Sequence, residues 1–238
     1  MADSFIGTLY GIGVGPGDPE LITLKGHRLL QRVPVVAWPA PLEGDSMARR
    51  IAAPHLTGGQ TEIAIRMPLS TDRFPVQAVY DRAAAELGAH LAAGRDVAVL
   101  CEGDPFVYGS FMYLFARMAE RFRVRVVPGI SSLTAGAAAL GLPLAARDDV
   151  LSVVPAPLPE ADLERRLAAA DAAVVIKIGR HLGKLRRVLE RLGLADRARY
   201  VEYATMDEQR IRPFAEVDGD QAPYFSLVVL HRRGEAWR

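Results

Sequence analysis

The chain has 238 residues, half of them hydrophobic and 24% charged, with a formal net charge of +1. This is an ordinary globular balance, and the length suffices for one large domain or two medium ones. A net charge near zero argues against a nucleic-acid partner, and no apolar run reaches the roughly 20 residues that span a bilayer. With a single cysteine and no charged-then-apolar leader after Met1, we expect a cytoplasmic protein with no membrane partner.

In the first half of the chain, strand-like apolar runs alternate with helical segments, which is typical of a parallel sheet covered by helices. Asp18 is expected to cap a helix, because Pro19 and Glu20 follow it at the positions that helix starts favour. Further helices are predicted over 76–93 and from Ser131 or Ser132 to Gly141. The predicted strands cover 8–13, 35–38, 61–67, 97–101 and 124–127.

The alternation of strand-like and helical segments changes near Leu142-Pro143-Leu144, where a second set of elements begins. Strands are predicted over 150–154, 173–178, 200–202 and 225–231, with helices over 160–170 and 182–192. We therefore expect an α/β protein of two domains. Residues 1–144 form an N-terminal domain with a parallel sheet, and residues 145–238 form a smaller, mixed α/β domain.

A glycine-rich loop, Gly11 to Asp18, follows the first predicted strand and precedes a helix. It lacks the dinucleotide-binding fingerprint, because Pro16 stands where the third glycine is needed and no acid ends the second strand. It also lacks the Gly-Lys-Ser/Thr of a phosphate loop. A carboxylate at Asp18 would take the free N–H groups of the helix and repel a phosphate. The loop therefore favours a neutral or cationic ligand.

Two further loops follow predicted strands, at Glu102-Gly103-Asp104-Pro105 and at Pro128-Gly129-Ile130-Ser131-Ser132. In an open α/β sheet, ligands bind beyond the carboxyl ends of the strands. All three loops are expected at that edge, so we expect them to converge on one ligand site.

With these three motifs in this order, the chain resembles the tetrapyrrole methylase family over about residues 8–231. That family has Gly-x-Gly-Pro-Gly-Asp-Pro-Glu-Leu, then Gly-Asp-Pro, then Pro-Gly-Ile-Ser/Thr. The stretches Cys101 to Leu114 and Glu202 to Gln209 resemble the branch of the family that methylates the C-20 meso carbon of precorrin-2 in cobalamin biosynthesis. Glu102 departs from a glycine that is common in the family.

The resemblance implies a two-domain protein, usually a homodimer, that holds S-adenosyl-L-methionine in the cleft between its domains and releases S-adenosyl-L-homocysteine. The implied acceptor is a tetrapyrrole, either metal-free precorrin-2 or its cobalt form. The family often has Met where Ile178 stands. Carried over motif by motif, the implied donor-binding residues are Pro16, Glu102, Gly103, Asp104, Val107, Ser131, Ser132, Ile178, Ala204, Thr205, Ser226 and Leu227.

Methyl transfer to an electron-rich carbon needs orientation more than an activated nucleophile. Asp104 and Tyr108 are candidates for the base that accepts the departing proton, although Asp104 alternatively holds the donor's ammonium group or caps a turn. Four arginines near the expected cleft are candidate partners for the substrate carboxylates, and the alternative for each is a solvated surface position. These arginines are Arg49, Arg50, Arg66 and Arg147.

Other chemistry finds less support in the sequence. Cys101 ends an apolar strand and is expected to be a buried structural thiol. The five histidines lack metal-ligand spacing, so no metal is expected. The alternative functions are another tetrapyrrole methylase of the family, a methylase of RNA or protein with the same fold, and a non-catalytic tetrapyrrole carrier.

Overall fold

The structure is a computed structural model that describes residues 6–67 and 73–233. The chain divides into two compact units, residues 1–131 and 132–238. The division expected from the sequence lies after residue 144 instead. The difference is α5 (Ser132–Leu140), whose Leu133 and Leu140 pack against strand residues of the second unit. No helix in the described ranges is long and apolar enough to cross a bilayer.

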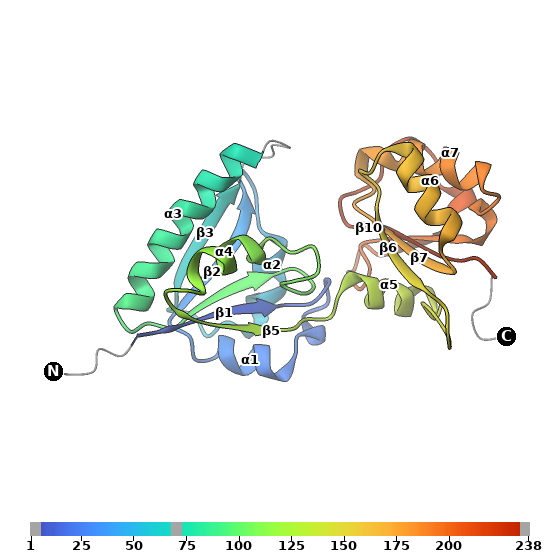
Figure 1. The fold of residues 1–238 in the computed structure, drawn as a ribbon. Helices are drawn as coiled ribbons and strands as arrows, with labels where there is room; N and C mark the ends of the chain where they lie inside the picture. The colour runs from blue at the N-terminus through green and yellow to red at the C-terminus, as the bar shows by residue number, and fades with distance from the viewer. Residues whose placement is uncertain (1–5, 68–72, 234–238) are drawn as a thin grey trace. The chain divides into compact units, whose positions relative to one another are not determined.

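The first unit is a five-stranded parallel sheet in the order β3-β2-β4-β1-β5 (Figure 1). Its strands closely match the predicted ones, because each is a short apolar run bounded by turn residues. They are β1 (Thr8–Gly13), β2 (Val35–Pro41), β3 (Thr61–Met67), β4 (Val97–Cys101) and β5 (Arg123–Val127).

Helices cover both faces of this sheet, so the central strands are apolar on both sides. On one face, α3 (Arg73–Ala92) and α4 (Phe111–Met118) pack on side chains such as Val35 and Ala37. On the other, α1 (Leu24–Leu30) and α2 (Met47–Ala52) pack on Val36 and Trp38. The two short helices α2 and α4 were not predicted.

The segment after Asp18 differs from the expected single helix. Asp18 accepts the N–H of Glu20 as predicted, but it caps only a 3-10 helix, η1 (Pro19–Leu21). The backbone is then extended at Ile22 and Thr23, and the Thr23 side chain caps α1 through the N–H of Gly26. A second capping residue therefore divides the predicted helix in two. A further 3-10 helix, η2 (Ala53–His55), follows α2.

The second unit is a mixed sheet in the order β6-β7-β10-β8-β9, with α6 and α7 on one face and α5 on the other. Its fold class matches the expected mixed α/β domain, with β9 as an unpredicted edge strand. The elements after α5 are β6 (Leu151–Pro155), α6 (Glu160–Ala169), β7 (Ala172–Ile176), η3 (Gly179–His181), α7 (Leu182–Arg191), η4 (Ala195–Arg197), β8 (Ala198–Glu202), β9 (Arg210–Pro213), η5 (Phe214–Glu216) and β10 (Ser226–His231).

Candidate functional site

The first two glycine loops are bonded to each other at the carboxyl edge of the first sheet. Beyond β1 and β4, the N–H of Val14 donates to the carbonyl of Cys101 at 2.9 Å. Gly15 and Gly103 then form an isolated antiparallel bridge, with the N–H of Gly103 donating to the Gly15 carbonyl at 2.7 Å. Gly103 has a φ of 63°, a conformation that favours glycine. These two loops therefore lie together at the sheet edge, as predicted.

The loop after β5 joins the same cluster through Asp104 and Gly129. One carboxylate oxygen of Asp104 accepts the N–H of Gly129 at 3.0 Å, and the other accepts the N–H of Phe106 at 2.8 Å. The backbones approach so closely that a Cβ added at Gly13 would lie 2.5 Å from the Gly103 carbonyl oxygen and 2.6 Å from the Cα of Gly129. Glycine is therefore required where the three loops meet.

The charges on these loops all have one sign. Residues 14–23, 102–110 and 128–131 contain four carboxylates and no Lys, Arg or His. The carboxylates belong to Asp18, Glu20, Glu102 and Asp104. An anionic ligand would be repelled here, whereas a cationic ligand would be attracted.

Glu102 joins the second loop to α2. Its carboxyl accepts a hydrogen bond from the backbone N–H of Ala48, which lowers its pKa. Desolvation by the surrounding protein is the larger effect, and it raises the pKa above the ordinary value although solvent still reaches the side chain. The residue that departs from the family pattern thus has a structural partner on a helix that the sequence did not predict.

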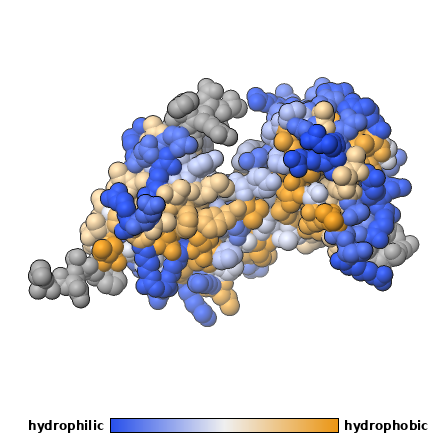
Figure 2. All heavy atoms as spheres, viewed as in Figure 1, coloured by the Kyte–Doolittle hydropathy of each residue, from blue (hydrophilic) through white to orange (hydrophobic). Residues whose placement is uncertain are grey.

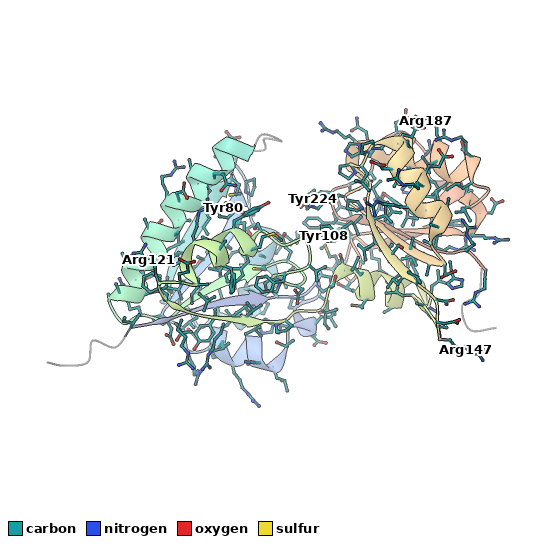
Figure 3. The ribbon with its side chains drawn as sticks, in the orientation of Figure 1. Tyr80, Tyr108, Arg121, Arg147, Arg187 and Tyr224 are labelled. Carbon is teal, nitrogen blue, oxygen red and sulfur yellow. The ribbon has the colours of Figure 1, made fainter. Side chains whose placement is uncertain are left out.

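The second candidate base, Tyr108, lies on the loop between β4 and α4 (Figure 3). Its φ of 55° is unusual for a residue other than glycine, and strain of this kind gathers at functional sites. Tyr108 and Val107 are both exposed, as are Phe106, Met112 and Tyr113. Figure 2 shows apolar side chains gathered on the first unit over α4. The loop therefore presents an apolar, aromatic surface beside the acidic glycine cluster.

The remaining first-unit candidates are placed as follows. Pro16 is buried between the glycines of the first loop. Ser131 ends the first unit and Ser132 begins α5 of the second. Cys101 is buried, and desolvation holds its pKa well above the ordinary value, so the predicted structural thiol is confirmed. Within the described residues, no three His, Cys, Asp or Glu side chains are placed to hold a metal ion.

The second-unit candidates gather at one edge of the second sheet, where β7 and β8 end and β10 begins. The side chain of Ile178 is fully buried among α6 and α7, so only its backbone is available to a ligand. Ala204 and Leu227 pack in the smaller core on the α5 face. Thr205 has a φ of 69°, and the hydroxyl of Ser226 donates to the Pro223 carbonyl at 2.7 Å.

A buried polar network, which sequence reasoning missed, supports this second edge. The hydroxyl of Tyr200 donates to the Glu202 carboxylate at 2.8 Å, and Arg212 on β9 donates to the same oxygen at 3.2 Å. The Glu202 side chain is only 8% exposed, and it precedes Tyr203 and Thr205, which both have positive φ. The available signal was the polar pair at 200 and 202, two residues apart on one face of a strand.

The four candidate arginines separate between the two units. Arg49, Arg50 and Arg66, all candidates from the sequence, line one pocket of the first unit. The pocket itself was not predicted. Arg147 is an exposed residue of the second unit, with a φ of 52°.

Three glycine loops that meet at the strand ends of a parallel sheet, with a second mixed unit after them, define a two-unit α/β protein whose loop cluster carries only negatively charged side chains. The family model of tetrapyrrole (corrin/porphyrin) methylases matches residues 8–218. The chain belongs to this family of methyltransferases.

Individual relatives support the same placement. The chain is 43% identical to a precorrin-2 C(20)-methyltransferase of a Sinorhizobium species, covering 97% of both chains. It is 45% identical to the cobalamin biosynthesis protein CobIJ of Mycobacterium tuberculosis, and it spans only 46% of that longer protein. A solved uroporphyrin-III C-methyltransferase of Thermus thermophilus, complexed with S-adenosylhomocysteine, is similar with a TM-score of 0.69 and 27% identity, covering 95% of this chain and 98% of that one.

Proposed function

We propose that the protein transfers a methyl group from S-adenosyl-L-methionine to the C-20 meso carbon of precorrin-2 or its cobalt form, a step of cobalamin biosynthesis. The observation that carries the proposal is the acidic, backbone-lined cluster of three loops at one sheet edge. The near full-length relative named precorrin-2 C(20)-methyltransferase supports the choice of acceptor and position.

The residues present fit this donor. The sulfonium and the ammonium of S-adenosyl-L-methionine are cationic, and the loops around Gly15, Gly103 and Gly129 are lined by carboxylates without a basic residue. Bound there, the donor supplies an electrophilic methyl group. The similar solved protein complexed with S-adenosylhomocysteine supports this assignment. The second-unit candidates Ile178, Ala204, Thr205, Ser226 and Leu227 stay a prediction.

The protein's contribution to the reaction is orientation. Asp104 holds two loops in place through backbone donors, and glycine at position 103 keeps the backbone open to close approach. Tyr108 stays the candidate proton acceptor, because its hydroxyl is on the same loop and its side chain is exposed.

Two measurements test this function. Titration calorimetry should give one S-adenosylhomocysteine site per chain. Incubation with donor and each tetrapyrrole should add one methyl group to the acceptor by mass. Transfer to RNA or protein with none to a tetrapyrrole would refute the proposal, and tetrapyrrole binding without transfer would indicate a carrier.

The homodimer and the cytoplasmic location also stay predictions. A monomer mass by light scattering at micromolar concentration would contradict the homodimer.

A further inference from the structure

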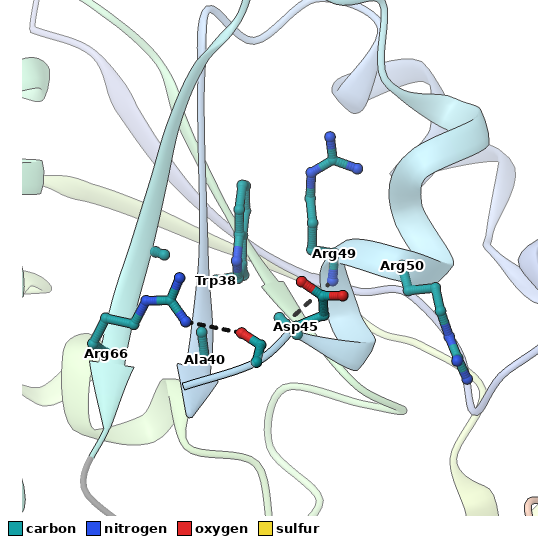
Figure 4. A pocket seen from close by; sticks show the side chains of 9 residues that line it. Trp38, Ala40, Asp45, Arg49, Arg50 and Arg66 are labelled. Carbon is teal, nitrogen blue, oxygen red and sulfur yellow. Dashed lines mark hydrogen bonds between the residues drawn. The ribbon is translucent and has the colours of Figure 1, made fainter. Parts of the chain in front are cut away.

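A pocket of about 300 Å³ lies in the first unit where β2 and β3 end (Figure 4). Trp38 and Arg66 come from the two strands, and Arg49 and Arg50 come from α2. The charged side chains that line it are these three arginines and Asp45, so the lining carries a net positive charge.

Two of the pocket residues form a fixed wall. The guanidinium of Arg49 lies 5.4 Å from the centre of the Trp38 ring, and Trp38 is only 8% exposed. Arg49 also donates two hydrogen bonds to the Glu62 carboxylate, at 2.9 and 2.8 Å. The bidentate pair offsets the charge of Arg49 and holds its side chain against the indole.

Arg66 is held by backbone carbonyls, whereas Arg49 is held by a carboxylate. Its Nη1 donates to the carbonyls of Pro41 and Gly44, both at 2.9 Å, and the side chain is exposed to solvent. Within the described residues, the hydrogen bonds of Arg66 use neither Nε nor Nη2. These two donors form the edge of a guanidinium that binds a carboxylate in bidentate fashion. Two backbone acceptors therefore fix Arg66 while its recognition edge stays available.

The pocket shares its sheet edge with the acidic loop cluster, but carries the opposite charge. In the order β3-β2-β4-β1-β5, all strands are parallel, so their carboxyl ends lie on one edge. The charged side chains of the loops after β4, β1 and β5 are all carboxylates. Beyond β2 and β3, the pocket has three arginines and Asp45. Glu102 joins the two halves through the Ala48 N–H of α2. This division suits a cationic donor at one end and an anionic acceptor at the other.

We propose that this pocket binds a peripheral carboxylate of the acceptor tetrapyrrole, with Arg66 as the bidentate partner and Arg50 adding positive charge. Anchoring one carboxylate beside the donor loops would select the carbon that faces the methyl group, so Arg66 is a specificity-determining residue. This inference rests on the proposed function, because it takes a tetrapyrrole as the acceptor.

Uroporphyrin, an air-stable porphyrin with eight carboxylates, is a direct probe that requires no turnover. Its affinity would be measured by absorbance titration for wild-type protein, Arg66→Ala, Arg66→Lys and Arg28→Ala, with S-adenosylhomocysteine affinity measured by calorimetry on the same samples. Arg28 is a matched control, an exposed arginine on α1 that does not line the pocket. We expect Arg66→Ala to weaken uroporphyrin binding about tenfold or more. Arg66→Lys should be intermediate and Arg28→Ala close to wild type, with S-adenosylhomocysteine affinity unchanged in all.

Wild-type uroporphyrin affinity in Arg66→Ala would overturn the inference. An equal loss of S-adenosylhomocysteine affinity would also overturn it, because the pocket would then serve the donor. The proposed function fails separately, if wild-type protein transfers no methyl group to any tetrapyrrole. Should Arg66→Ala fail to fold, Arg50→Ala and the charge-preserving Arg66→Lys carry the same comparison.

Discussion

The carboxylate of Asp104 bonds to the backbone N–H of Gly129 at 3.0 Å and thereby ties the loop after β4 to the loop after β5. Its second oxygen accepts the N–H of Phe106 within its own loop. Because both oxygens accept backbone N–H groups, the Asp104 carboxylate holds the two loops together. This favours a positioning role over that of a proton acceptor.

Asp104→Ala removes both hydrogen bonds and leaves two N–H groups without their partner. We expect a loss of about 1–3 kcal/mol in the free energy of unfolding and at least a tenfold loss in S-adenosylhomocysteine affinity. Denaturant unfolding and calorimetry measure the two effects.

Asp104→Asn separates the positioning role from the role of proton acceptor. Asparagine keeps one acceptor oxygen, so a positioning role predicts a partial loss of donor affinity. Any loss of turnover should then follow from the weaker donor binding. If kcat falls by two orders of magnitude while donor affinity is unchanged, Asp104 is the proton acceptor and the positioning role is wrong.

A pair of glycine substitutions tests the close approach of the loops. In Gly129→Ala, the new Cβ would overlap the Gly103 carbonyl and the backbone of Gly13, so we expect a loss of about 1–3 kcal/mol in stability together with weaker donor binding. In Gly88→Ala, on α3, the Cβ would lie 3.4 Å from the Phe122 ring, an ordinary contact. There the same change should stabilise the protein by about 0.5–1 kcal/mol. Equal effects of both substitutions on stability would contradict the close approach of the loops at Gly129.

Glu102 predicts a pH dependence of stability. Its pKa is raised in the folded protein, so the folded state binds more protons than the unfolded state between the ordinary value, about 4.5, and the raised value. Stability contributed by this group is therefore lost as the pH rises through that window. Glu102→Gln keeps an acceptor for the Ala48 N–H but does not ionise. The melting temperature of the variant minus that of wild type should increase from pH 4 to pH 8. The increase should correspond to about 1 kcal/mol or less of unfolding free energy, because solvent reaches the side chain. A constant or decreasing difference would contradict the assignment.

The sheet and the meeting of the three loops were predictable, because both depend on local signals. Apolar runs bounded by glycine mark the strands, and parallel strands place their carboxyl ends together. The break after Leu21 was hidden because Asp18 and Thr23 are both valid capping residues, and only the extended backbone at Ile22 shows which helix each one serves.

The sequence named Arg49, Arg50 and Arg66 as candidates, but their meeting in one pocket could not be predicted, because it depends on long-range pairing. Arg49 and Glu62 lie on α2 and β3, and nothing in their sequence separation indicates that one holds the other against Trp38. The same holds for Arg212 and Glu202 in the second unit, which meet only because β9 pairs with β8. Such pairs follow from strand order, which a single sequence does not determine.

The position of methylation tests the central claim most directly. The protein would be incubated with precorrin-2 and, separately, with its cobalt form, using S-adenosyl-L-methionine labelled with carbon-13 in the methyl group. Carbon NMR of the product should show one labelled methyl on the C-20 meso carbon. Label at C-2, C-7 or C-17 instead would contradict the proposed position while leaving the family membership intact.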